Sequence, residues 1–289
     1  MGALSSDSCG DLHRSGAGTP MVLLHGVNLS WRIWRPVIPF LESHHDVLAP
    51  TLAGHLGGPR LTSPVQGVGS LADAIETMLD DLGIDRAHLV GNSLGGWLAC
   101  ELAERGRALS VVAFSPAGAW DSLPSMRRIL RLMQLSKNSA GWPATRRLVE
   151  RPGVRRSLMK MAVERGDLIP ADVAIDMLDE TQACVVLDGL IPWLRANPFL
   201  DEFRLEPSVP VRVAWPVTDR TIPYLPYGRA FRALLPGAEL VGLRGVGHVP
   251  TYDDPRLVAD TILEVSSRRT PVRTSNNPPR GDARNLPRT

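Results

Sequence analysis

The fold is decided by the stretch Ala87-His88-Leu89-Val90-Gly91-Asn92-Ser93-Leu94-Gly95-Gly96. Its first four residues are typical of a buried strand, and a helical pattern begins at about Leu94. The turn between them matches G-x-S-x-G, in which the glycines leave room for a sharp strand-to-helix reversal and the serine takes a strained backbone conformation. We therefore expect the Ser93 hydroxyl at the carboxyl edge of a sheet, beside a helix N-terminus. The alternative is a helix-capping serine in a glycine-rich turn.

Further short apolar runs indicate more strands on both sides of this stretch. They lie at 21–24, 46–49, 109–114, 209–215 and 238–243. Residues 71–82 have the apolar spacing of a helix and end at Gly83. Because short strands alternate with helices, the pattern predicts an α/β fold with a mostly parallel central sheet and helices on both faces.

Residues 118–206 differ from the rest of the chain, because their only periodicity is helical. Their prolines, at 124, 143, 152, 170 and 192, predict a series of short helices. The chain is thus expected to have a sheet core of residues 19–117 and 207–266 and a helical cap inserted at 118–206.

The two ends of the chain have little core-forming character. Residues 1–18 predict a flexible N-terminal segment, and residues 267–289 a disordered basic tail. The tail has six arginines and one aspartate, a charge of +5, so a total of +2 leaves −3 for the body. We expect the tail to be solvated, and we predict no nucleic-acid partner.

Composition narrows the class of protein further. With 289 residues the chain can bury a large core without a disulfide or metal. Its three cysteines are an odd number without C-x-x-C spacing, which argues against a disulfide framework and a thiolate zinc site. No apolar run approaches the length of a membrane span, and no N-terminal signal pattern appears. A cytoplasmic protein is the expectation.

A serine nucleophile needs a base and a group that orients the base. We predict His248 as the base, because it lies in the loop Gly245-Val246-Gly247-His248 after the last expected strand. Asp219 follows the strand at 209–215 and can reach the same sheet edge. Of the other histidines, His25 is expected to shape its loop and His88 to be packed in a strand, whereas three are expected on the surface or in loops: His44, His45 and His55. Asp253 and Asp254 are expected to cap the last helix.

These features together resemble the α/β-hydrolase family, in its cap-bearing group of esterases, lipases and carbon–carbon-bond hydrolases. The resemblance covers about residues 19–266 and rests on His25-Gly26, the elbow at 91–96, Asp219 and the loop at 245–248. It implies a Ser-His-Asp triad and an oxyanion hole formed by the backbone N–H groups of Val27 and Leu94. A tryptophan expected after the oxyanion loop corresponds to Trp31 or Trp34.

The chain also departs from the family pattern. The Asp-x-Pro-Gly-x-Gly loop of the family is replaced by Thr51-Leu52-Ala53-Gly54-His55-Leu56, and Trp215-Pro216 stands where Trp-Gly is common. The first antiparallel strands of the fold are expected to be absent or shortened. Epoxide hydrolases and haloalkane dehalogenases of this family use an aspartate at the nucleophile position, so Ser93 argues against both activities.

The leading interpretation is a serine hydrolase that cleaves an ester or related acyl bond without a metal or cofactor. The methionines and tryptophans of the expected cap favour an apolar or aromatic substrate of moderate size. We expect Trp31, Trp97 and Trp120 to contact it. Two alternatives remain open, namely a carbon–carbon-bond hydrolase with the same triad and a non-catalytic ligand-binding protein.

Overall fold

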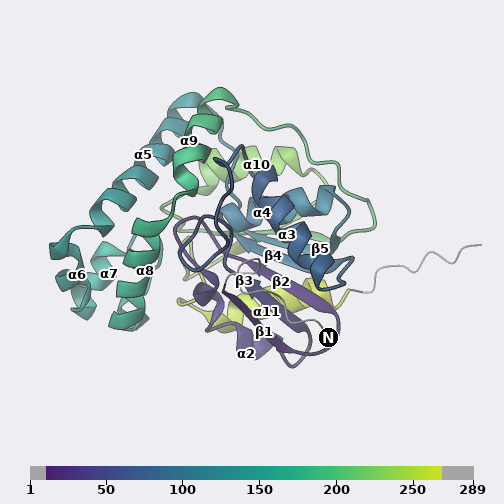
Figure 1. Cartoon of the computed structure of the whole chain (residues 1–289), viewed down its shortest axis with the longest axis horizontal. Coiled ribbons are helices and arrows are strands. Elements are labelled where there is room, and N and C mark those ends of the chain that lie inside the picture. Colours follow the sequence, from purple (N-terminus) through teal and green to yellow (C-terminus); the bar gives the residue numbers. More distant parts are fainter. Residues whose placement is uncertain (1–10, 269–289) are drawn as a thin grey trace, which may run out of the picture.

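A seven-stranded sheet forms the centre of this computed structural model, which describes residues 11–268 (Figure 1). In spatial order the strands are β1, β3, β2, β4, β5, β6 and β7; β1 is antiparallel to β3 and every other pairing is parallel. Their bounds are β1 Leu12–Gly16, β2 Pro20–Leu24, β3 Asp46–Pro50, β4 Ala87–Asn92, β5 Ala108–Phe114, β6 Val211–Pro216 and β7 Glu239–Leu243. The predicted mostly parallel sheet is confirmed.

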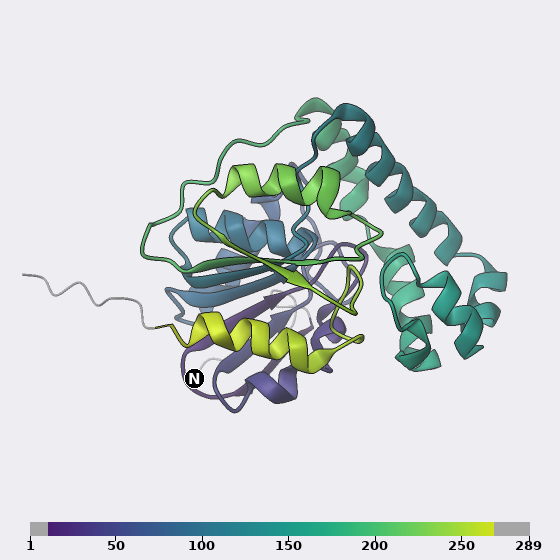
Figure 2. The same cartoon turned by 180° about the vertical axis from the view of Figure 1, so that it is seen from behind.

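Helices cover both faces of the sheet, as predicted. Helices α3 (Gly69–Asp81), α4 (Leu94–Glu104) and α10 (Arg229–Leu234) lie on one face, and α2 (Ile38–Leu41) and α11 (Pro255–Ser266) on the other (Figures 1 and 2). Two single turns, η1 (Trp31–Trp34) and η3 (Tyr224–Gly228), connect to the sheet edge.

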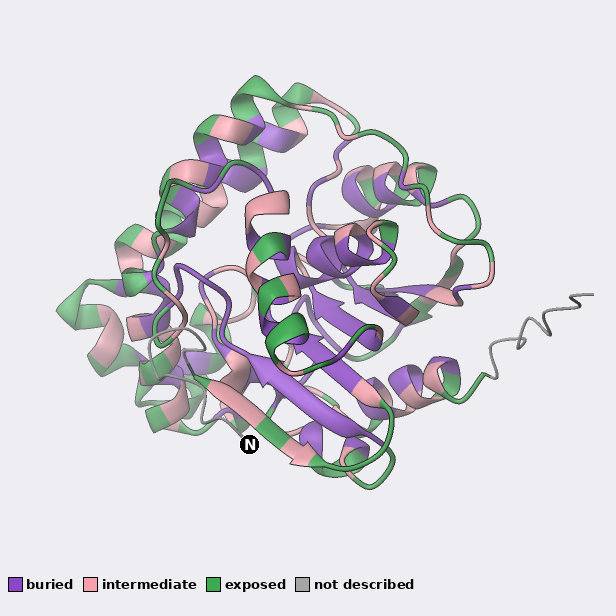
Figure 3. Cartoon of the chain, turned by 45° about the vertical axis from the view of Figure 1, so that its right-hand side comes forward, coloured by how far each residue is buried: buried purple, intermediate pink, exposed green. Residues whose placement is uncertain are grey.

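The alternation of side chains along the strands builds two cores. In β2, Val22 and Leu24 belong to the core under α3 and α4, whereas Met21 and Leu23 belong to the core under α2 and α11. All four side chains are fully buried. Each such side chain contributes about 1.5–3 kcal/mol of hydrophobic stabilisation. The inner strands are buried along their length, and the edge strand β1 is half-buried to exposed (Figure 3).

The segment between β5 and β6 is helical, as predicted, and lies beyond one end of the sheet (Figures 1 and 2). We call residues 118–206 the helical insertion. Its helices are α5 (Leu123–Ala140), α6 (Pro143–Val149), α7 (Pro152–Leu158), η2 (Gly166–Leu168), α8 (Ala171–Ala183) and α9 (Val186–Ala196). Four prolines stand at helix starts, but Pro192 lies inside α9, so that proline does not break the helix as predicted.

The N-terminal prediction is wrong for residues 12–16, which form β1 and not a flexible segment. Arg14 on this strand forms a bidentate ion pair with Asp46 of β3, with nitrogen–oxygen distances of 3.0 and 2.6 Å. Pairing with a neighbouring strand, which no local periodicity reveals, is what orders this segment. Residues 1–10 and the predicted tail from residue 269 onward lie outside the described residues. Within residues 11–268 no helix is long and apolar enough to cross a membrane.

A pair of histidines links the strands to the last helix, at the sheet edge opposite Ser93. The rings of His45 and His88 meet edge to face at 5.0 Å. His45 also bonds the hydroxyl of Ser266 in α11 at 2.9 Å, and His88 bonds Ser110 at 2.8 Å. His88 is packed in its strand as predicted, and His45 lies in the loop before β3, as predicted, although it is buried. Burial lowers the pKa of His88 to about 4 and also lowers the pKa of His45.

These shifts predict a stability that falls in mild acid. When the pKa of a histidine is lower in the folded than in the unfolded protein, protonation favours the unfolded state. The contribution of that histidine to the free energy of unfolding is therefore complete above about pH 6.5 and is lost as the pH falls towards 4. Between pH 7.5 and pH 5 the melting temperature of the wild type should therefore fall further than that of His88→Asn, and the two decreases should differ by roughly 2–4 °C. The exposed His44 supplies the control, since the melting temperature of His44→Asn should depend on pH with nearly the same slope as that of the wild type. Equal slopes in all three proteins would contradict this assignment.

Candidate active site

Ser93 occupies a sharp turn between β4 and α4, as the sequence predicts. Its backbone has φ 56° and ψ −116°, a conformation that residues other than glycine rarely adopt. The flanking glycines are required by space. A Cβ atom on Gly91 would lie 2.0 Å from the carbonyl oxygen of Gly95, and one on Gly95 would lie 2.1 Å from that of Leu24. The elbow therefore fixes the serine at the end of β4.

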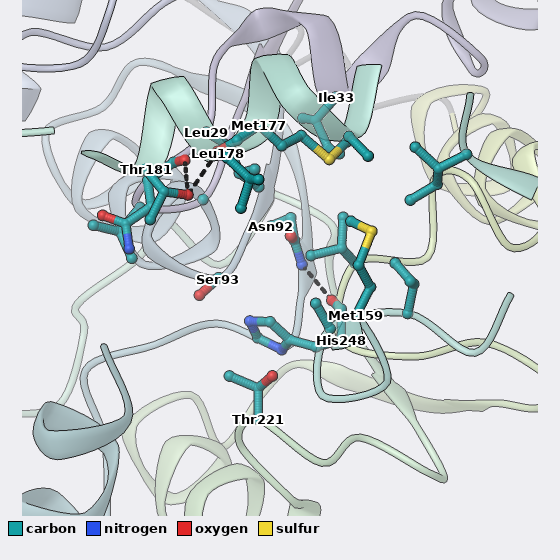
Figure 4. A pocket seen from close by; sticks show the side chains of 18 of the residues that line it. Leu29, Ile33, Asn92, Ser93, Met159, Met177, Leu178, Thr181, Thr221 and His248 are labelled. Atoms are coloured by element: carbon teal, nitrogen blue, oxygen red, sulfur yellow. Dashed lines mark hydrogen bonds between the residues drawn. The ribbon is translucent and has the colours of Figure 1, made fainter. Parts of the chain in front are cut away.

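His248 and Asp219 meet at the same edge of the sheet. The Nδ1 atom of His248 lies 2.8 Å from Oδ2 of Asp219, and both side chains are buried. The other carboxylate oxygen, Oδ1, accepts the N–H of Ile222 at 2.9 Å. This carboxylate holds the proton of the imidazole on Nδ1, which leaves Nε2 to act as a base. Figure 4 shows the Ser93 and His248 side chains among those that line one pocket.

Two residues, whose roles the sequence did not reveal, hold the loop at 245–248, which we call the histidine loop. The Asn92 amide donates to the carbonyl oxygen of His248 at 2.9 Å (Figure 4) and to that of Phe114 at 3.2 Å. Asp253 accepts three backbone N–H groups, from Gly247 at 2.8 Å and from residues 164 and 165 of the helical insertion at 2.9 and 2.7 Å. Asp254 caps α11 as predicted, whereas the same prediction is wrong for Asp253.

The two expected oxyanion donors lie on either side of Ser93. Leu94 is the first residue of α4, and Val27 follows Gly26, where a Cβ atom would lie 3.3 Å from Cβ of Ser93. Within residues 11–268 the N–H groups of Val27 and Leu94 have no protein acceptor. Both are therefore free to bind a negatively charged oxygen.

His25 shapes its loop, as predicted. Its Nδ1 bonds the carbonyl oxygen of Gly26 at 2.8 Å, and its Nε2 accepts the N–H of Leu52 at 2.9 Å. Burial holds its pKa well below the usual range, so the ring stays neutral. The ring of His55 meets it at 4.8 Å and is buried; this histidine lies in a loop, as predicted, but not on the surface.

Two apolar cavities meet at Ser93. Cavity 1 has a volume of about 190 Å³ and cavity 2 about 60 Å³, and both are lined by Val27, Ser93, Met133 and Thr221. Figure 4 shows side chains of cavity 1, among them Met159, Met177 and Leu178 of the helical insertion, around Ser93 and His248. Among the described residues, no Lys, Arg, Asp or Glu lines either cavity. No group of three or more metal-ligating side chains occurs within residues 11–268.

The three tryptophans expected at the substrate have different positions. Trp97 and Trp120 line cavity 2. Trp31 lines neither cavity, because its ring stacks on His13 at 4.8 Å and lies under the guanidinium of Arg35 at 5.0 Å. The structure thus does not bring Trp31 to the site. The short helix η1 instead directs Ile33 into cavity 1.

Known proteins of similar sequence and structure agree with this architecture. A profile of the Alpha/beta hydrolase family matches residues 21–261. The chain belongs to this family. A serine hydrolase from the polyaromatic hydrocarbon-degrading bacterium Cycloclasticus zankles has the same fold, with a TM-score of 0.68 and 20% identity over 90% of this chain and 95% of that chain.

Two curated relatives indicate a hydrolase enzyme. Epoxide hydrolase EphH of Mycobacterium tuberculosis is 32% identical over 204 residues, which cover 66% of this chain and 91% of that protein. A 2-hydroxy-6-oxo-2,4-heptadienoate hydrolase of Pseudomonas putida is 41% identical over 98 residues, which cover 33% of this chain and 36% of that protein. The two names share hydrolysis but differ in the substrate.

The supports of the histidine loop predict unequal effects of two adjacent aspartates. Asp253→Asn replaces one acceptor oxygen by an NH₂ group that faces backbone donors, so it should cost about 1–3 kcal/mol of stability and lower kcat. Asp254→Asn should change neither, since asparagine caps helices as well as aspartate does. Urea unfolding and ester turnover of both variants test this. Equal behaviour of the two variants would contradict the role given to Asp253.

Proposed function

We propose that this hydrolase cleaves an ester or related acyl bond of a moderately sized apolar substrate through Ser93, His248 and Asp219. One observation carries the proposal: the strained Ser93 elbow, where two apolar cavities meet, lines cavity 1 together with a histidine that is bonded to a buried carboxylate. A non-catalytic binding protein would need the cavities but not this arrangement.

The geometry supports a two-step reaction. Nε2 of His248 takes the hydroxyl proton of Ser93 as the oxygen attacks the carbonyl carbon, and Asp219 stabilises the resulting imidazolium. The N–H groups of Val27 and Leu94 bind the oxyanion, and each such donor contributes about 3–4 kcal/mol to transition-state stabilisation. The imidazolium then protonates the leaving alcohol. Water, activated by the same histidine, hydrolyses the acyl-enzyme and restores Ser93.

The helical insertion acts as the cap in this proposal. It supplies much of the apolar lining of both cavities: Met133, Val149, Met159, Ala162, Val163, Ile169, Ala174, Met177, Leu178, Trp120, Ile129, Leu130, Leu187, Leu190, Ile191 and Leu194. Such walls exclude water from the acyl-enzyme and strengthen the hydrogen bonds to the oxyanion. They also favour uncharged substrates.

Chemistry argues against epoxide hydrolysis, despite the name of the relative from Mycobacterium tuberculosis. An aspartate that opens an epoxide forms an ester, which water can hydrolyse. A serine that opens an epoxide forms an ether, which water does not cleave under these conditions. Ser93 therefore cannot turn over an epoxide through a covalent intermediate.

The carbon–carbon-bond hydrolase is the second candidate, favoured by the relative from Pseudomonas putida. The substrate in the name of that relative is a carboxylate. Among the described residues, neither cavity has a lysine or arginine side chain to neutralise a carboxylate. Because neither cavity can neutralise a carboxylate in this way, a neutral acyl substrate is the better supported of the two candidate substrates.

Substitution of the three proposed catalytic residues tests the mechanism. Ser93→Ala and His248→Ala should each lower kcat by about 10⁴–10⁶, and Asp219→Asn by about 10⁴ or less. Thermal melting should show folded protein in each case. Turnover of p-nitrophenyl esters provides the measurement, and an active Ser93→Ala protein would overturn the proposal.

The two cavities predict separable specificity. Ala174→Val narrows cavity 1, and Ala119→Val narrows cavity 2. With esters lengthened only on the acyl side or only on the alcohol side, each variant should lower kcat/KM for the long members of one series roughly tenfold. The other series should be unchanged. If both variants shift the same series, or neither series moves, the two-cavity arrangement does not govern specificity.

A further inference from the structure

The end of α8 in the helical insertion bonds the loop that bears the Val27 N–H group. Glu180 accepts a hydrogen bond from the hydroxyl of Ser30, and both side chains are buried. The Ser30 oxygen also accepts the N–H of Arg32 at 3.3 Å, so its own proton is available for Glu180. The hydroxyl is therefore fully used, as donor to the insertion and as cap of η1.

A second contact lies one residue further along. Oγ1 of Thr181 lies 3.3 Å from the carbonyl oxygen of Asn28 and 2.7 Å from that of Met177, so these two oxygens share one hydroxyl proton (Figure 4). Asn28 has a φ of 67°, an uncommon conformation for a residue other than glycine. The loop is thus bonded to α8 on the residue directly after Val27 and again at Ser30.

Burial of a carboxyl group costs desolvation free energy, so Glu180 is an unfavourable group with which to attach α8 to this loop. Removal of Glu180 from water raises its pKa, and the guanidinium of Arg32 approaches its Oε1 only to 3.7 Å. Apolar packing would attach α8 at lower cost. What a hydrogen bond adds to apolar packing is direction, because it fixes the place of one atom.

We infer that Glu180 is a positioning residue for the oxyanion hole, acting through Ser30 on the loop that carries Val27. This inference rests on the proposed function. Oxyanion donors must lie within about 2.7–3.1 Å of the position of the oxyanion, so small displacements of the loop weaken transition-state binding. The helical insertion then contributes to catalysis directly, in addition to lining the cavities.

The test compares Glu180→Ala, Ser30→Ala and the double variant with the wild type, using an ester and its thionoester. Sulfur accepts hydrogen bonds weakly, so the ratio of the two rates reports on the oxyanion donors. Glu180→Ala and Ser30→Ala should each lower kcat about ten- to a hundredfold with KM nearly unchanged. Each should also shift the ester-to-thionoester ratio severalfold towards one. The double variant should lose no more than either single variant.

Two further variants separate positioning from stability. Glu180→Gln retains an acceptor for Ser30 and should recover most of kcat. Asp179→Ala removes the neighbouring carboxylate of α8, which pairs with Arg146 on the surface, and should leave kcat and the ratio unchanged. If Glu180→Ala does not fold, Ser30→Ala and Glu180→Gln carry the test.

Two results would overturn the inference. One is an unchanged kcat in Glu180→Ala and Ser30→Ala; the other is a lower melting temperature with an unmoved ester-to-thionoester ratio. Ser93→Ala in the same assay keeps the two proposals apart. If its activity persists, the proposed function fails. If its activity is lost while the Glu180 variants are unaffected, only the positioning role fails.

Discussion

The close approach of two backbones, at the start of α4 and the end of β2, sets the geometry of the site. A Cβ atom on Gly95 would lie 2.1 Å from the carbonyl oxygen of Leu24 and 2.7 Å from that of His25. Because no side chain separates the backbones, the loop after β2 and the first turn of α4 lie side by side, and Ser93 must take a positive φ. The pairing of β4 with β2 and β5 and the buried face of α4 hold this strained conformation in place.

The helical insertion is bonded to three loops that extend from this edge, those of Val27, Asp219 and His248. Its residues 161 and 162 accept hydrogen bonds from the Thr221 hydroxyl, two residues after Asp219, and from the N–H of Val249, next to His248. Asp253 bridges its residues 164 and 165 to the histidine loop, and α8 bonds the loop of Val27. The proposed acid and base and one expected oxyanion donor thus share one support, which couples the shape of the cavities to the placement of these groups.

The sequence predicts the features that depend on local pattern. The apolar runs predict the parallel strands within one or two residues, and the glycines around Ser93 predict its turn. It does not predict β1, because an edge strand of mixed polarity is ordered by its partner β3. The roles of Asp253 and Glu180 are also hidden, since each depends on contacts between segments far apart in the chain. Trp31 shows the opposite error: its spacing from the oxyanion loop fits a substrate contact, but η1 directs Ile33 inward in its place.

The central claim, that Ser93 is a nucleophile, is tested most directly by mass spectrometry after reaction with a fluorophosphonate. Cleavage after arginine releases residues 87–105 as one peptide, in which Ser93 is the only serine. The account predicts that this peptide gains the mass of one phosphonyl group. It also predicts that His248→Ala slows the labelling, since the hydroxyl then has no base. An unlabelled 87–105 peptide, with the phosphonyl group on another residue or absent, would contradict the account.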